Sequence, residues 1–170
     1  PSKENIDVYF GTATPIRVTD HDYVALSVAT DMLGSGGFTG HLMKTVRERD
    51  GLTYGIFSRL RDLSSTYPLL LVTFASFGNS LFKKGVSTTR KEIGAWLSSG
   101  ITEEELRKKK QEIIGSYTVS LQDPDEISWK LMSAIAGGRD YRFLAKYPAL
   151  VRKLTVKDVR RVARNHFDPK

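Results

Sequence analysis

Hydrophobic positions alternate with polar or small ones near the start of this chain and then recur at helical spacing over most of the remainder. Ile6, Val8 and Phe10 show the two-residue period of a half-buried strand. Leu26 and Ala29 belong to a stripe with the three-to-four-residue spacing of a helix. The pattern as a whole predicts strands at 6–14, 52–60 and 68–77, and helices at 20–34, 39–51, 80–99, 102–121, 124–136, around Phe143, and at 155–165.

Polar and glycine residues mark where several of these helices begin and end. Asp20 and Thr39 are suited to cap the first two helices, because a short oxygen-bearing side chain can accept an unpaired backbone N–H. Thr102 and Glu105 have the spacing of a capping box, and Gly51 suits the end of the second helix. These signals place the helix boundaries independently of the hydrophobic pattern.

The order of the elements predicts an α+β fold. Strands come first and a run of helices follows, which is typical of helices packed on one face of a mixed, largely antiparallel sheet. We expect residues 1–170 to form a single domain, since no linker or internal repeat interrupts them. Three strands are few for a stable sheet, so we expect a fourth that the pattern conceals or that lies beyond Lys170.

Composition narrows the class of protein. The chain has 170 residues, 40% hydrophobic and 26% charged, which is ordinary for a folded soluble domain, and no apolar run approaches the roughly 18 residues of a membrane span. There is no cysteine, so disulfides and thiolate metal sites are excluded. The first residue is proline rather than methionine, and we therefore expect these residues to be cut from a longer protein. The compartment stays open between cytoplasm and periplasm.

The formal net charge of +7 raises the possibility of a basic nucleic-acid-binding domain. The most basic run, 107–110, follows three glutamates placed four residues before its first three members. No aromatic residues are interleaved with the basic ones, as they would be on a base-stacking surface. We therefore expect a solvated helix face and no specific nucleic-acid partner.

Metal sites, phosphate-binding loops and nucleophilic serines each require residues at a characteristic spacing in the sequence. His21, His41 and His166 have no second ligand at helical distance, and the zinc motif H-x-x-E-H is missing in either direction. The GSGG stretch from Gly34 follows a helix, whereas a phosphate-binding loop follows a strand. A serine nucleophile would need a G-x-S-x-G turn, which does not occur. The sequence therefore predicts no metal or cofactor site in this chain.

Arg47 and Tyr54 are the most informative pair of polar residues. At about 100° per helical residue, Arg47 lies roughly 40° from Met43 and borders the predicted buried stripe, whereas Arg49 lies about 200° further round and should face solvent. Tyr54 begins the following strand and should share a face with Ile56. A guanidinium and a phenol so placed could converge on one carbonyl oxygen. The alternative is a local ion pair for Arg47 and simple packing for Tyr54.

Four stretches of the chain resemble the C-terminal, non-zinc half of the insulinase, pitrilysin and mitochondrial processing peptidase family of zinc metallopeptidases. They are DHDYVALSVATDMLGSGGFTGHL, VRERDGLTYGIFS, SSGITEEELRKKKQEI and LTVKDVRRVARNHFDP, of which the first two together are the more specific. The resemblance implies one half-domain of the LuxS and mitochondrial-processing-peptidase-like metallohydrolase fold.

The resemblance also implies a function. In that family a separate homologous half, fused or on another subunit, carries H-x-x-E-H and zinc and hydrolyses an extended peptide. The non-zinc half contributes an arginine and a tyrosine, matched here by Arg47 and Tyr54, that hydrogen-bond the substrate carbonyl near the scissile bond. This chain would thus be inactive alone, with zinc in the partner half.

Two alternatives remain at the level of sequence. A non-proteolytic scaffold or assembly member of the same family would share these features, and the nucleic-acid-binding domain is the weaker alternative. Gly40 and His41 stand where many relatives have serine and arginine, which puts in doubt any contact between helices that the arginine makes. This departure leaves Arg47 and Tyr54 unaffected.

Overall fold

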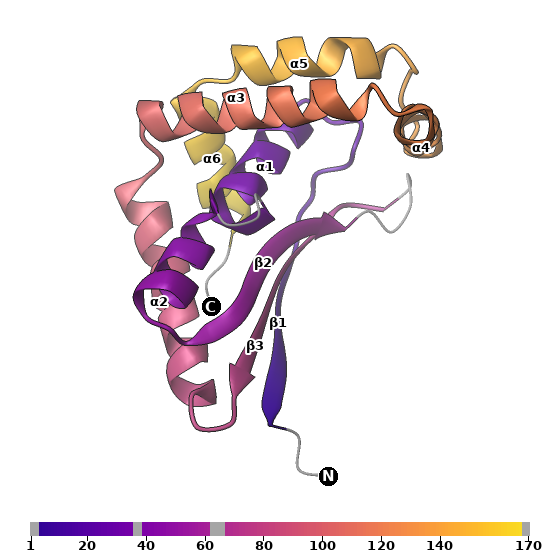
Figure 1. Ribbon diagram of the computed structural model, residues 1–170. Helices are drawn as coiled ribbons and strands as arrows, with labels where there is room; N and C mark the ends of the chain where they lie inside the picture. Colours follow the sequence, from indigo (N-terminus) through magenta and orange to yellow (C-terminus); the bar gives the residue numbers. More distant parts are fainter. Residues whose placement is uncertain (1–3, 36–38, 62–66, 168–170) are drawn as a thin grey trace.

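A three-stranded antiparallel sheet forms one side of the molecule (Figure 1). The strand order is β1-β3-β2, so β3 is central and the other two strands are edges. The structure is a computed structural model that describes residues 4–35, 39–61 and 67–167. The strands are β1 Asn5–Ala13, β2 Thr53–Arg61 and β3 Leu70–Gly78. These three match the predicted strands to within two residues, and no fourth strand occurs among the described residues.

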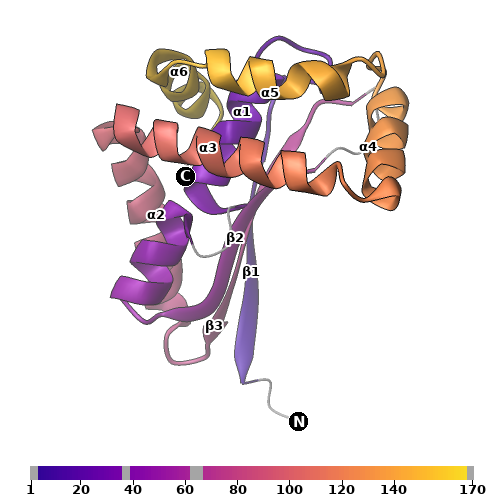
Figure 2. The ribbon, with the colours of Figure 1, turned by 45° about the horizontal axis from the view of Figure 1, so that its top comes forward.

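The helices lie on one face of this sheet, which confirms the predicted α+β class. Figures 1 and 2 both show α3 and α5 side by side across one end of the molecule, with α2 running along the sheet. The α-helices are α1 Tyr23–Thr30, α2 Phe82–Ser99, α3 Glu103–Ser120, α4 Pro124–Ala136, α5 Phe143–Lys153 and α6 Val156–His166. Two π-helical segments, η1 Asp31–Ser35 and η3 Met43–Arg49, lie between α1 and β2. None of the helices among the described residues is both long and apolar enough to cross a membrane.

The core lies between the sheet and the helices. β3 alternates strictly, with Ala75 and Phe77 fully buried toward the helices and their neighbours only half-buried. Ile56 of β2, Leu26 of α1 and Leu42 just before η3 complete this buried layer. The two-residue period of β3 thus fixes which face the helices cover.

The opposite face of the sheet carries a row of aromatic side chains. The Phe74 ring lies 5.2 Å from that of Tyr9 and 4.9 Å from that of Phe57, measured between centroids. The Arg59 guanidinium lies 4.6 Å from the Phe57 centroid. These pairs cross all three strands and hold their register by side-chain contact.

Two predicted helix caps are wrong, because the side chains bind elsewhere. The Asp20 carboxylate accepts the Arg17 N–H at 2.8 Å, and α1 begins after Asp22 without a side-chain cap. Thr39 donates to the Glu112 carboxylate of α3 at 3.2 Å instead of capping the second helix. Tertiary contacts have displaced local capping at both positions. Gly36 and Gly37 of the GSGG stretch lie outside the described residues.

The start of α3 follows the prediction more closely. Thr102 accepts from the Glu105 N–H, and the Glu105 carboxylate accepts from the Thr102 N–H, so the capping box is confirmed. Glu104 pairs with Arg107 at 2.8 Å and with Lys108 at 3.3 Å. Arg107 and Lys108 thus form a solvated, partly neutralised face as expected. The expectation is wrong for the rest of the run, because Lys109 is buried and Lys110 donates to Arg152 O of α5.

Candidate functional site

Arg47 lies on η3 at the edge of its buried side. Leu42, Met43 and Val46 are buried, while Arg47 is half-buried and Lys44 is exposed. The apolar stripe read from the sequence is therefore the one that packs into the core. The guanidinium of Arg47 is carried at the border between core and solvent, as predicted.

A tight turn joins this segment to β2. Gly51 has φ 63°, a conformation that residues with a Cβ rarely adopt. Its N–H donates to Arg47 O at 3.0 Å, and the Leu52 N–H donates to Val46 O at 3.0 Å. The turn that separates Arg47 from Tyr54 is thus closed by backbone hydrogen bonds and a glycine suited to it.

Tyr54 occupies a β-bulge at the start of β2. Thr53 pairs with Phe77 and Gly55 with Ser76, so Tyr54 is the extra residue between them. The Thr53 hydroxyl accepts the Gly55 N–H at 3.2 Å and donates to Ser76 O, which holds the bulge in place. Bulges re-aim side chains in this way.

The bulge corrects the predicted face of Tyr54. Ile56 is 1% exposed whereas Tyr54 is 94% exposed, so the two do not share a face. Strict alternation failed here because one residue is inserted into the ladder. The alternative in which Tyr54 simply packs against its neighbours is also excluded by this exposure.

Arg47 and Tyr54 line one open pocket of about 470 Å3. Its other walls come from the turn and from the ends of β1 and β3. The lining residues are Asn5, Arg47, Glu48, Gly51, Leu52, Thr53, Tyr54, Ser76, Gly78 and Leu81. Two residues whose side chains can donate hydrogen bonds thus border the same open space.

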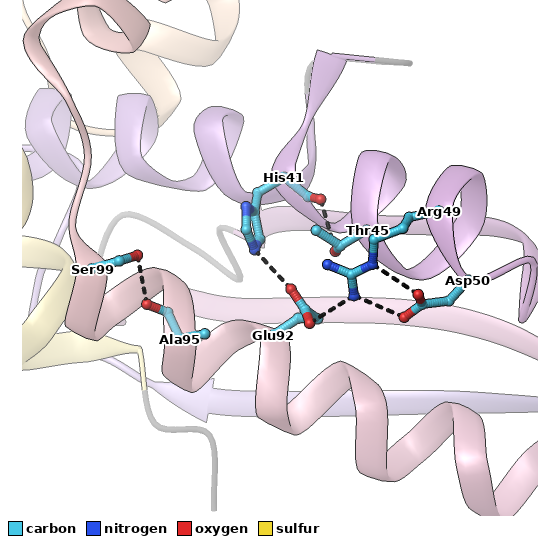
Figure 3. A network of polar contacts seen from close by, with 7 residues as sticks. All are labelled: His41, Thr45, Arg49, Asp50, Glu92, Ala95 and Ser99. Carbon is cyan, nitrogen blue, oxygen red and sulfur yellow. Dashed lines mark hydrogen bonds and ion pairs between the residues drawn. The ribbon is translucent and has the colours of Figure 1, made fainter.

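Arg49 faces solvent as predicted, but it is also held by two carboxylates. Its guanidinium donates to both carboxylate oxygens of Asp50, at 2.8 and 2.9 Å, and to Glu92 Oε1 of α2 at 2.9 Å (Figure 3). Helical angle alone placed it correctly toward the surface but could not show that α2 reaches there. Glu92 was not identified from the sequence. Thr89, Glu92 and Trp96 recur at helical spacing and are all buried, so a carboxylate within this series could have indicated a buried ion pair.

His41 completes this network from the other end of the helical segment. Its Nε2 atom is buried and lies 3.4 Å from Glu92 Oε2, without a well-formed hydrogen bond. Burial lowers the pKa of His41 below its usual value of 6.5, against the opposing effect of the Glu92 carboxylate. His41 therefore stands in the folded protein mainly as a neutral ring at neutral pH.

Acidification between pH 7.5 and 5.5 is expected to destabilise the fold in part through His41. Because its folded pKa lies below 6.5, the unfolded chain binds the proton more readily, and stability present above pH 6.5 is lost as pH falls below it. Each unit of difference is worth about 1.4 kcal/mol. Urea unfolding at both pH values should show a smaller loss in His41→Gln than in wild type. Equal losses would contradict this assignment.

The other histidines offer no metal site either. His21 is exposed beside Asp22, and His166 is half-buried with its pKa lowered by burial. Among residues 4–35, 39–61 and 67–167, no three His, Cys, Asp or Glu side chains are grouped so that they could hold a metal ion. A zinc centre does not fit the described part of this chain.

A larger cleft of about 630 Å3 lies beside α1, α5 and α6. Two of its charged residues pair with each other. Arg161 donates to both oxygens of Asp22 at 2.7 Å and lowers the pKa of that carboxyl to about 2. Arg139 lies between the Tyr23 and Phe143 rings, 3.8 and 3.9 Å from their centroids. These contacts join helices, and we assign the cleft no ligand.

Comparison with known proteins adds an independent finding. Residues 1–113 match the family model described as the peptidase M16 inactive domain. An uncharacterized zinc protease of Mycobacterium tuberculosis is 30% identical over 162 residues, which cover 95% of this chain and 36% of the relative. A Helicobacter pylori protein described as the non-peptidase homolog YmxG is 30% identical over 118 residues, 66% of this chain and 26% of that protein.

A solved structure shares the fold. The peptidase M16 inactive domain from Pseudomonas fluorescens superposes with a TM-score of 0.85 at 24% identity, over 97% of this chain and 39% of that one. The chain thus spans about a third of the length of the curated relatives that it matches over nearly its whole extent.

Proposed function

This chain belongs to the peptidase M16 family as an inactive domain, and from that premise we propose that it holds the peptide substrate of a zinc-dependent peptidase. The family is the one that the sequence resembles, so that prediction is confirmed. Hydrolysis itself is assigned to a separate half that carries the H-x-x-E-H motif and zinc. This chain would supply binding and orientation.

One observation carries the proposal, namely that Arg47 and Tyr54 line the same open pocket on either side of a rigid turn. Both groups donate hydrogen bonds, and a carbonyl oxygen can accept two. As the carbonyl carbon is attacked, negative charge grows on that oxygen, and donors already in place stabilise it more than they stabilise the ground state. The pair would thus bind the scissile carbonyl and favour its reaction.

The partner is the remaining length of such a protein. The relatives are about three times as long as the matched segment, and the M. tuberculosis relative is described as a zinc protease. We assign the zinc-bearing homologous half, fused or separate, as partner, and an extended peptide as substrate. An extended peptide exposes its backbone carbonyls, which folded protein does not.

An assembly experiment tests this function. The chain, the zinc-bearing half and the two together would each be assayed with an internally quenched extended peptide. We expect cleavage only when both are present, with stoichiometric zinc in the zinc-bearing half alone. Cleavage by this chain alone, or zinc bound to it stoichiometrically, would overturn the proposal.

A second function is supported by the similarity to a non-peptidase homolog. In that case the domain serves as a scaffold or assembly subunit without proteolysis. The same experiment separates the two functions, because a scaffold would assemble with its partner but bind no zinc and cleave no peptide in the complete protein.

A further inference from the structure

Glu92 of α2 contacts both ends of the helical segment that carries Arg47. One carboxylate oxygen, Oε1, accepts from Arg49 at 2.9 Å, and the other, Oε2, lies 3.4 Å from the His41 ring (Figure 3). The side chain is only 10% exposed. A single buried carboxylate thus reaches from His41, two residues before η3 begins, to Arg49, its last residue.

The contact with Arg49 continues into the turn. Arg49 holds Asp50 through two parallel hydrogen bonds, and Asp50 is the residue immediately before Gly51. Arg47 lies two residues before Arg49, and Tyr54 lies four residues after Asp50. The contacts Glu92–Arg49–Asp50 therefore attach the stretch 47–54, which carries both proposed carbonyl donors, to α2.

A buried carboxylate is an expensive way to join two helices. Removing it from water costs several kcal/mol, which pairing offsets only when the geometry is good, and an apolar residue often serves stability equally well. Thr89, Ile93 and Trp96 surround this position on the buried side of α2. Arg49 donates one hydrogen bond to Glu92 and two to Asp50, so its planar guanidinium adds what apolar packing lacks, which is a fixed direction.

We infer that Glu92 is a positioning residue for the two carbonyl donors, acting through Arg49 and Asp50 to fix the orientation of Arg47 and Tyr54. This inference rests on the proposed function of that pair. Glu92 itself touches no substrate. Its effect follows because catalysis falls steeply when donors are displaced by even an ångström from the reacting atom.

The test uses the complete peptidase, with the zinc-bearing half present. Glu92→Gln keeps the size of the side chain but removes its charge, and we expect it to lower kcat by about tenfold with KM little changed. The matched control is Asp22→Asn, which breaks another arginine–carboxylate contact between helices, Arg161 to Asp22, remote from the pocket. This control should lower stability without lowering kcat.

A double variant separates positioning from general loss of structure. If Glu92 acts through Arg47, Glu92→Gln should lower kcat/KM in the wild-type background but hardly at all in an Arg47→Met background. Losses that multiply in the double variant, or a wild-type kcat in Glu92→Gln, would overturn the inference. An Arg47→Met variant with unchanged kcat/KM would instead overturn the proposed function.

A second variant covers the case in which Glu92→Gln does not fold. Arg49 is 55% exposed, so Arg49→Gln breaks the same contact from the solvent side with little burden on the core. We expect the same fall in kcat and the same dependence on Arg47. Wild-type kcat in a folded Arg49→Gln enzyme would contradict positioning by this route.

Discussion

Replacing Arg47 by methionine in the complete peptidase should lower kcat/KM for peptide cleavage by about 100- to 1,000-fold, the usual effect of removing one preorganised oxyanion donor. Methionine keeps the apolar stem that borders the core and removes only the charged donors. The loss should appear in kcat, since the bond to the carbonyl oxygen strengthens as charge develops there. Steady-state kinetics with an extended peptide would measure it.

Tyr54→Phe is the complementary change and should act in the same direction. The phenol is 94% exposed, so deleting its hydroxyl leaves the fold and its stability unchanged. Tyr141→Phe, at another exposed tyrosine remote from the pocket, is the matched control and should keep full activity. Wild-type kcat/KM in both Arg47→Met and Tyr54→Phe would show that the pair does not hold the carbonyl.

Replacing Phe77 by alanine should lower the free energy of unfolding by about 3–5 kcal/mol. Phe77 is fully buried next to the last residue of β3, and its ring lies against Gly85 of α2. The loss combines the removed apolar surface with a cavity that the sheet and helix cannot close. Chemical denaturation followed by circular dichroism would measure it.

Two glycines of α2 provide a matched pair of controls for this packing. A Cβ at Gly85 would lie 2.3 Å from the Phe77 ring, whereas a Cβ at Gly94 would meet nothing within 4 Å. Gly85→Ala should therefore destabilise by about 1–3 kcal/mol. Gly94→Ala should stabilise by up to about 1 kcal/mol through helix propensity. Equal effects of the two changes would refute the close contact between α2 and Phe77.

Local signals explain how much of the fold was predictable. Asp123 before Pro124 marks a helix start that needs no tertiary information, and the predicted helix 124–136 has the bounds of α4. The three strands follow from hydrophobic period alone, whereas the second predicted helix, 39–51, forms largely as the shorter π-helical segment η3. These elements are those in which neighbours in sequence decide the structure.

α5 was predicted only as a short piece around Phe143, but it extends to Lys153. Pro148 lies inside it and cannot donate the helical hydrogen bond to Leu144 O. The Tyr117 hydroxyl of α3 donates to that same oxygen at 3.0 Å. A helix continued through proline with the help of another helix is beyond the reach of local sequence patterns.

The candidate site likewise contains one residue that local sequence places and two features that it does not. Arg47 could be placed at the border of the core from its spacing to Met43, although η3 is a π-helix and departs from the α-helical turn that this spacing assumes. The bulge at Tyr54 could not, since it depends on the Thr53 hydroxyl meeting Ser76 on a neighbouring strand. Glu92 also depends on distant packing, as α2 reaches η3 only in the folded chain.

The near-complete exposure of Tyr54 has a consequence for the cell. When a phenol in bulk water binds a peptide carbonyl, it replaces a hydrogen bond to water with one to the peptide, and the net gain in free energy is small. The isolated chain would therefore bind polypeptides only weakly. Only a chamber that excludes water would turn the same hydroxyl into an effective grip. Arg47 and Tyr54 would then bind a peptide effectively only when the two halves close around it, with the catalytic centre on the opposite side.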